Sequence, residues 1–186
     1  MIYNWKRIVR YSLPILTLSI FIEIFTGQIL QGRQGSLVAV PIFLITIPVV
    51  NGVGGNIGSV LGARLASGLH VGYISLTIKD KEMHENLLTS ILIGGITYLA
   101  LAILIYLMAS YGNIQMRVGF IEYIFIVVGA GILLVFVISL VSVFTAFLSF
   151  KRGLDPDDII APVVTTVGDT LGIVFLFLLI GVVGIW

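Results

Sequence analysis

The sequence predicts an all-α integral membrane protein with five transmembrane helices. Of its 186 residues, 59% are hydrophobic and only 10% are charged, and the mean hydropathy is +1.17. A soluble domain of this length cannot cover so much apolar surface with so few charges. Five apolar segments are each long enough to cross the hydrocarbon core, which takes about 20 residues of helix.

The five predicted spans follow one another with short polar connections. The first is too long for the apolar part of a signal peptide and has no evident small-residue cleavage site, so we expect it to be retained. No segment resembles a separate soluble domain, and we expect one membrane domain over residues 1–186. The spans cover about 11–31, 36–63, 86–110, 119–149 and 158–185.

Basic residues predict the orientation of these spans, because cytoplasmic loops of membrane proteins are enriched in Lys and Arg. With a cytoplasmic N-terminus, Arg33 and Arg117 lie outside and the other eight basic residues lie in the cytoplasm. The C-terminus then lies outside, and the protein is expected to be a multi-pass protein of the cell membrane. The eight are Lys6, Arg7, Arg10, Arg64, Lys79, Lys81, Lys151 and Arg152.

Several function classes are excluded by composition. A net charge of +1 offers no basic field for nucleic acid, and the absence of cysteine excludes disulfides and thiolate metal sites. His70 and His84 are isolated and do not form a metal-ligand pattern, so we expect a solvated loop around His84. No catalytic set such as Ser/His/Asp is present. The sequence therefore predicts neither an enzyme nor a bound cofactor.

Two carboxylates interrupt the apolar spans, and such residues usually face a bundle interior or a watery cavity. Glu23 lies about 16 Å from the start of the first span, and Asp169 lies about 16 Å from the start of the fifth. Asn56, on the second span, lies about 12 Å from Arg64. The three side chains therefore share a level near the middle of the membrane. The alternative for both carboxylates is a role in assembly only.

The polar residues of the fifth span fall on one face, at spacings of three and four residues. Asp158, at the start of this face, suits the positive end of the helix dipole and is also a possible acidic mouth for cations. On the first span, Glu23 shares a face with Ser12, Ser19 and Thr26. The face on the fifth span is made by Asp158, Pro162, Thr165, Thr166, Asp169 and Gly172.

The segment "PVVNGVGGNIGSVLG", Pro48 to Gly62, carries one proline, five glycines and two asparagines within a span. Proline removes a backbone donor and glycine leaves helical geometry cheaply, so the sequence predicts a broken second helix. Freed carbonyls and the oxygens of Asn51 and Asn56 would then line an ion pathway. The alternative is a ridge of small residues for tight helix packing, made by Gly54, Gly58, Gly62 and Ala66.

Two motifs resemble a known family. "PVVNGVGGNIGSVLGARLASGLHVG" resembles the second-helix signature of the MgtE magnesium channels and the related solute carrier family 41, and "DPDDIIAPVVTTVGDTLG" resembles their fifth-helix signature. The resemblance implies a central pore lined by the second and fifth helices of two parallel five-helix modules. It implies that Asp169 helps hold the ion, that Thr165 and Thr166 match the paired threonines, and that Gly54, Gly55 and Asn56 match the Gly-Gly-Asn core.

The resemblance also sets expectations about partners and regulation. One module per chain implies a parallel homodimer in the lipid bilayer. Bacterial relatives carry a cytoplasmic sensor domain, whereas this chain has about ten residues before its first span, so regulation is absent, intrinsic or supplied by a separate protein. We expect a divalent cation transporter or channel, with Mg²⁺ as the cargo. The alternatives are transport or exchange of Co²⁺ or Mn²⁺, and a non-transporting membrane scaffold.

Overall fold

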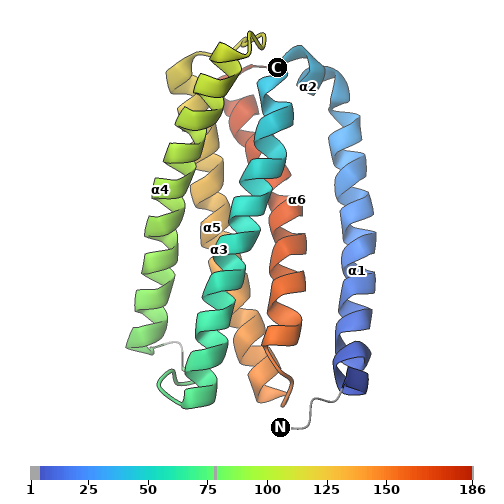
Figure 1. Cartoon of the computed structure of the whole chain (residues 1–186), viewed down its shortest axis with the longest axis vertical. Helices are drawn as coiled ribbons and strands as arrows, with labels where there is room; N and C mark the ends of the chain where they lie inside the picture. The colour runs from blue at the N-terminus through green and yellow to red at the C-terminus, as the bar shows by residue number, and fades with distance from the viewer. Residues whose placement is uncertain (1–4, 78, 186) are drawn as a thin grey trace.

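The structure, a computed structural model, describes residues 5–77 and 79–185, and these form α-helices and connecting loops without a β-strand (Figure 1). Five of the helices are long and apolar enough to cross a membrane, which confirms the predicted fold class. The helices are α1 (Trp5–Gly32), α2 (Gln34–Ala39), α3 (Ile42–Val71), α4 (Lys81–Tyr111), α5 (Phe120–Lys151) and α6 (Asp157–Val183).

The long helices run up and down in turn, so α1 begins and α6 ends at opposite ends of the bundle (Figure 1). The α3–α4 and α5–α6 connections both lie at the N-terminal end. Most of the basic residues are therefore gathered at one end of the molecule, as the predicted orientation requires.

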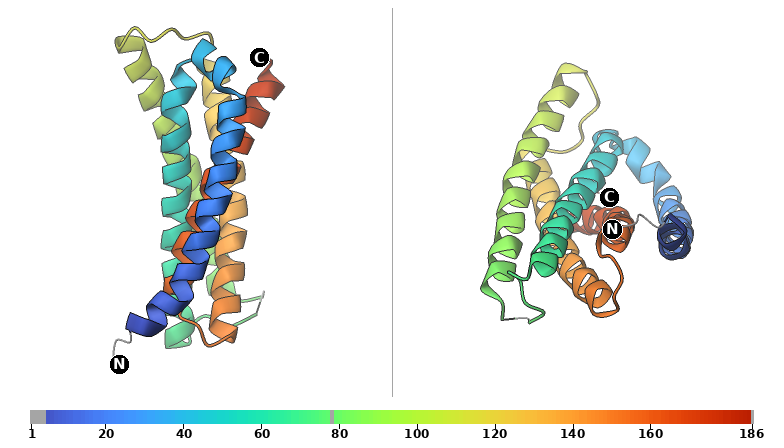
Figure 2. Two further views of the ribbon diagram at one scale, coloured as in Figure 1. Left: turned by 90° about the vertical axis from the view of Figure 1, so that its right-hand side faces the viewer. Right: turned by 60° about the horizontal axis from the view of Figure 1, so that its bottom comes forward.

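Helix α6 is central to the packing. It contacts α3, α5 and α1, whereas α4 packs against α3 and α5. Among the long helices described, α1 packs only against α6, and Figure 2 shows it standing to one side of the bundle. In the part of the chain that the structure describes, helices α1 and α3 do not contact each other, so the side chains of α6 lie between them.

The predicted break in the second membrane helix is wrong. Helix α3 is α-helical without interruption from Ile42 to Val71, and Pro48 lies inside it. The interruption lies earlier, at Val40 and Pro41, where α2 ends and α3 begins. Val40 has φ −133° and ψ 74°, which is not helical, and a residue before proline disfavours the α-helical region. The predicted span 36–63 is therefore a short helix followed by a long one.

The glycines of α3 stay helical because neighbouring helices pack tightly against them. A methyl group on Gly58 would collide with Ile138 and Val164, and one on Gly62 would collide with Ile160. Gly54, Gly58, Gly62 and Ala66 are all buried, which confirms the packing alternative. Tertiary contacts thus override the low helix propensity of glycine.

Two carbonyl groups of α3 also receive side-chain hydrogen bonds from the bundle. The Tyr98 hydroxyl donates to the Val50 carbonyl at 2.8 Å, and the Ser142 hydroxyl donates to the Gly58 carbonyl at 3.0 Å. Both donors are buried on α4 and α5. These contacts fix the glycine-rich part of α3 to the side of the bundle away from α1.

The polar connection predicted from Arg64 to Glu85 begins later than expected. Helix α3 continues through Arg64 and ends at Val71, before Gly72 with φ 86°. Only glycine adopts this left-handed geometry at no steric cost, so Gly72 ends the helix. Helix α4 begins at Lys81, with Asp80 as its N-cap.

Candidate cation pathway

Asp169 lies near the middle of α6 and is half-buried. It follows the start of α6 by about 18 Å of helix, a depth close to half of the roughly 30 Å hydrocarbon core. Helices α3 and α1 both pack against this helix. Polar side chains from both of these helices approach the turn of α6 that carries Asp169.

From α3, Asn51 reaches the backbone of Asp169. Its Nδ2 donates a hydrogen bond of 3.0 Å to the Asp169 carbonyl oxygen, and its side chain is only 7% exposed. Its Oδ1 lies against Gly172, where a methyl group would collide with it. Within the described residues this Oδ1 has no hydrogen-bond partner. A buried polar atom without a partner is costly and points to a functional or hydrated site.

From α1, Thr26 and Glu23 approach the same part of α6. The hydroxyl groups of Thr26 and Thr170 form a hydrogen bond of 2.7 Å, which fixes the level of α1 against α6. Glu23 lies about one turn before Thr26 on α1 and interacts electrostatically with Asp169. The two carboxylates that the sequence placed at one depth therefore lie at a similar level on two packed helices.

The paired threonines of α6 have different environments. Thr165 is exposed, and its hydroxyl donates to the carbonyls of Ala161 and Pro162 at 2.9 and 3.1 Å. Thr166 is only 3% exposed, and its Oγ1 has no hydrogen-bond partner in the part of the chain that the structure describes. Thr165 therefore faces outward beside Asp169, and Thr166 faces into the bundle.

The Gly-Gly-Asn core of α3 is divided between two faces. Gly55 lies against α6, where a methyl group would stand 3.2 Å from the Thr165 Cγ2 atom. Gly54 is turned toward α5 and α4, against Leu134 and the Tyr98 hydroxyl. Asn56 is exposed. Gly55 and Asn56 therefore adjoin the outward face of α6, and Gly54 faces the opposite side of α3.

The two remaining predicted residues are Asn51 and Asp158. Asn51, rather than Asn56, contacts Asp169, because α3 runs antiparallel to α6 and brings Asn56 level with Thr165. Asp158 is part-buried at the start of α6, about 16 Å of helix from Asp169. Thr170 was missed by the sequence reasoning, although its position next to Asp169 in "TTVGDT" was an available signal.

An outward stripe of small and polar residues runs along α3 beside this site, at spacings that place its members on one helix face. We call it the open stripe. It continues onto α6 through Ala161 and Thr165, both exposed. By contrast, α4 exposes large apolar residues such as Leu104 and Ile96. The open stripe on α3 consists of the exposed residues Gly52, Asn56, Ala63 and Ser67 and the part-buried Ser59, and Val60 is exposed beside them.

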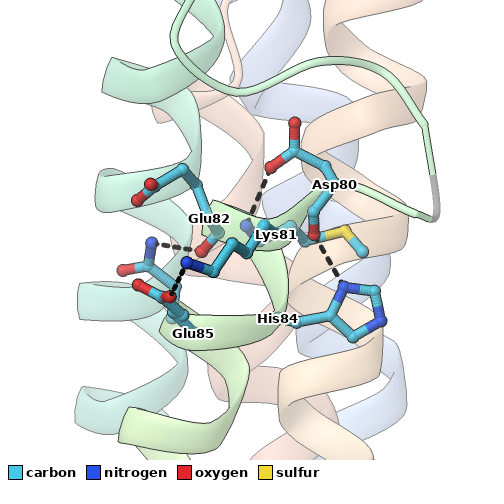
Figure 3. Close-up of polar contacts among 7 residues, drawn as sticks. Asp80, Lys81, Glu82, His84 and Glu85 are labelled. Atoms are coloured by element: carbon cyan, nitrogen blue, oxygen red, sulfur yellow. Dashed lines mark hydrogen bonds and ion pairs between the residues drawn. The ribbon is translucent and has the colours of Figure 1, made fainter.

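A second polar cluster lies where the α3–α4 connection enters α4, and it includes His84 (Figure 3). The predicted loop around His84 is wrong, because His84 lies in the first turn of α4. The Ser75 hydroxyl, together with the amides of Ser75 and Met83, donates hydrogen bonds to the Asp80 carboxylate and lowers its pKa from 3.8 to about 2. His84 Nδ1 lies 2.6 Å from the Asp80 carbonyl, and Lys81 pairs with Glu85 at 3.4 Å. These groups hold the first turn of α4.

Among the described residues, no three His, Asp or Glu side chains converge as a metal-binding group. The pathway residues of one chain are instead one exposed carboxylate, one half-buried carboxylate, and the amide and hydroxyl groups around them. Such hard oxygen groups suit cations that bind oxygen.

Comparison with known proteins identifies the family of this membrane module. A profile of the MgtE family, described as divalent cation transporter, matches residues 47–179, from α3 to near the end of α6. A search of the curated proteins finds no match. The matched segment includes Asn51, the open stripe and Asp169, and it covers most of the chain. The chain belongs to the MgtE family of divalent cation transporters.

Proposed function

We propose that the protein is a parallel homodimer that carries Mg²⁺ across the membrane through a pore between its two subunits, lined by α3 and α6. The observation that carries this proposal is the position of Asp169. It is a half-buried carboxylate at mid-membrane depth, held from α3 by Asn51, and it adjoins an outward face of small and polar residues.

The open stripe supports the homodimer. Asn56, Ser67 and Thr165 are exposed on single subunits within helices long enough to span the membrane. Polar side chains facing lipid are costly, whereas the same residues facing a watery pore or a second subunit are not. The small members, Gly52 and Ala63, allow two helices to approach closely. A second copy on this face would therefore hide the stripe from lipid.

The chemistry of the face supports Mg²⁺ as cargo. Mg²⁺ dehydrates reluctantly and keeps several waters while it contacts few carboxylates. Two Asp169 side chains, one from each subunit, would supply two negative charges, and the hydroxyl of Thr165 and the amide of Asn56 would hydrogen-bond the retained waters. Carrying two charges across a potential of 100 mV releases about 4.6 kcal/mol, which is sufficient to drive passive uptake.

Other residues act on the pathway without facing it. Asn51 and Thr166 are buried, and Gly55 allows α3 to approach α6 closely. Their role is to place Asp169 and Thr165. Glu23 adds a second carboxylate from α1, and it raises the negative potential that a cation meets near Asp169.

Flux into proteoliposomes tests the identity of the cargo. Purified protein is reconstituted with a Mg²⁺-sensitive dye inside, and an inside-negative potential is imposed. We expect Mg²⁺ influx that excess Co²⁺ or Mn²⁺ reduces only by competition. Faster influx of Co²⁺ or Mn²⁺ than of Mg²⁺ at equal concentration would contradict Mg²⁺ as the cargo. The absence of influx of any divalent cation into vesicles that contain folded dimer would support a scaffold role.

A further inference from the structure

A cavity of about 580 Å³ lies at the N-terminal end of the bundle, between α1 and α5. Both helices pack against α6 but not against each other, so a wedge is left between them. The volume is in the range of ordinary small-molecule sites, about 300–1,000 Å³. It is lined by Ile15 of α1, by Ile159 and Val163 of α6, and by one face of α5 from Val137 to Arg152.

The lining is polarised along α5. Its upper part is apolar, and its lower part carries Thr145, Ser149 and then Arg152, at spacings that place all three on one face of the helix. Arg152 is the C-cap of α5, where the chain leaves the membrane-spanning region. Thr145 and Ser149 are 7% and 4% exposed. The cavity therefore has a long apolar end and a short polar end that carries one cation.

The charge of Arg152 has no counterpart among the lining residues, which include no carboxylate. Within the described residues, its side chain forms no ion pair or hydrogen bond. Asp155 and Asp158 lie nearby in the chain, at the start of α6, but neither lines the cavity. The cavity thus presents an uncompensated guanidinium, a group that binds phosphate in bidentate geometry.

The length of the cavity suits one leaflet of a bilayer. From Arg152 to Val137 the lining follows α5 for about 22 Å, and half of the hydrocarbon core is about 15 Å. Leu140 and Phe144, which are 50% and 68% exposed, form its outer edge, open to the surroundings of the bundle. An acyl chain entering from the bilayer would meet apolar side chains in the upper part of the cavity.

We propose that this cavity binds an anionic phospholipid, with its phosphate at Arg152 and an acyl chain between α1 and α5. Basic pockets between membrane helices on the cytoplasmic side are suited to anionic head groups. The lipid would join α1 to α5 at the end where α1 otherwise packs only against α6. This inference does not rest on the proposed transport of Mg²⁺.

A second copy of the chain is the other possible occupant, and the geometry disfavours it. On α6, Ile159 and Val163 line the cavity, whereas Ala161 and Thr165 belong to the outward face beside the open stripe. With 3.6 residues per turn, these two pairs point in directions about 160° apart. A subunit docked on the open stripe therefore leaves the cavity facing lipid.

Native mass spectrometry of the detergent-purified full chain tests the site, with dioleoylphosphatidylglycerol and dioleoylphosphatidylcholine as probes. We expect the parent to bind phosphatidylglycerol about tenfold more tightly than phosphatidylcholine, because of the Arg152–phosphate contact and the net negative charge of the lipid. Arg152→Gln should lose this preference. Lys151→Gln is the matched control, since it removes the same charge one residue away from the cavity, and it should retain the preference.

Equal losses in Arg152→Gln and Lys151→Gln would overturn the proposal, because they would indicate diffuse attraction to the basic end of the protein. Val163→Phe, which fills the apolar end, should weaken the binding of both lipids and leave the dimer intact. A loss of dimer with unchanged lipid binding would assign the cavity to a second copy of the chain. If Val163→Phe does not fold, the comparison of Arg152→Gln with Lys151→Gln still tests whether the lipid phosphate binds at Arg152.

Discussion

The Nδ2 group of Asn51 donates a 3.0 Å hydrogen bond to the backbone carbonyl of Asp169, and this contact joins α3 to α6 at mid-membrane depth. The other side-chain atom of the same amide, Oδ1, lies over Gly172. Asn51 therefore holds the turn of α6 that carries Asp169. The role proposed for Asn51 is to place the carboxylate rather than to touch the cation.

Replacing Asn51 by alanine should reduce Mg²⁺ flux several-fold while the protein still folds. The lost hydrogen bond costs about 1 kcal/mol of unfolding free energy, partly offset because the unpaired Oδ1 is removed as well. Flux and thermal unfolding of the same preparation measure the two effects. Ser139→Ala is the control, because it removes another buried side-chain oxygen without a hydrogen-bond partner, on α5, and should leave flux unchanged. Equal flux in Asn51→Ala and the parent would contradict the positioning role.

Replacing Gly172 by alanine should disturb the same contact from the other side. The added methyl would collide with Asn51 Oδ1, and overpacking of this kind costs about 1–3 kcal/mol. Gly181→Ala, on the same helix with nothing within 4 Å of the added methyl, should instead leave stability unchanged or raise it by about 0.5–1 kcal/mol. Thermal unfolding in detergent compares the two. A Gly172→Ala variant as stable and active as Gly181→Ala would show that the contact is dispensable.

Apolar length and the spacing of costly residues were sufficient to predict the five spans and the neighbourhood of Glu23 and Asp169. Both follow from local rules, since a helix rises by a fixed step and a carboxylate avoids lipid. The course of α3 could not be predicted in the same way. Gly54 and Gly58 can either break a helix or allow other helices to pack closely against it. The outcome depends on Leu134 and Ile138, which lie about 80 residues away in sequence.

The same limit applies to the pairing of Asn51 with Asp169. The sequence predicted Asn56 at the level of Asp169, but both asparagines lie on α3, about one and a half turns apart, and only the packing of α3 against α6 selects between them. Proline was also misleading, because Pro48 is accommodated within α3 while Pro41 separates α2 from α3. The restriction that Pro41 places on Val40, the residue before it, was the better local signal of a helix boundary.

The Asp80 cap should make the stability of the α3–α4 end dependent on pH. The folded pKa of about 2 lies below the usual value of 3.8, so the contribution is fully present above about pH 4 and is lost as the pH falls toward 2. Asp80→Ala should therefore lower the unfolding temperature at pH 7, and this difference should narrow between pH 4 and pH 2. Glu85→Gln, which breaks only an exposed ion pair, is the control and should change little. A difference independent of pH would contradict the role of the charged cap.

The proposed homodimer predicts a specific crosslink. The chain has no cysteine, so a single introduced cysteine reports on one position. Asn56→Cys, on the open stripe, should crosslink to its counterpart in membranes treated with a short bifunctional thiol reagent. Leu104→Cys should not, although Leu104 is 60% exposed on the apolar face of α4. Crosslinking through Leu104→Cys alone would place the subunit interface on α4 and contradict an interface on the open stripe.

Mg²⁺ flux into proteoliposomes with the parent and Asp169→Ala side by side is the most direct test of the central claim. Asp169 is half-buried on the outward face of α6, so its removal should leave the folded dimer intact, as judged by size and thermal unfolding. The account predicts rapid influx in the parent under an inside-negative potential and almost none in the variant. Equal influx in both, or a variant that loses its dimer while its monomer still carries Mg²⁺, would contradict a pore lined by α6.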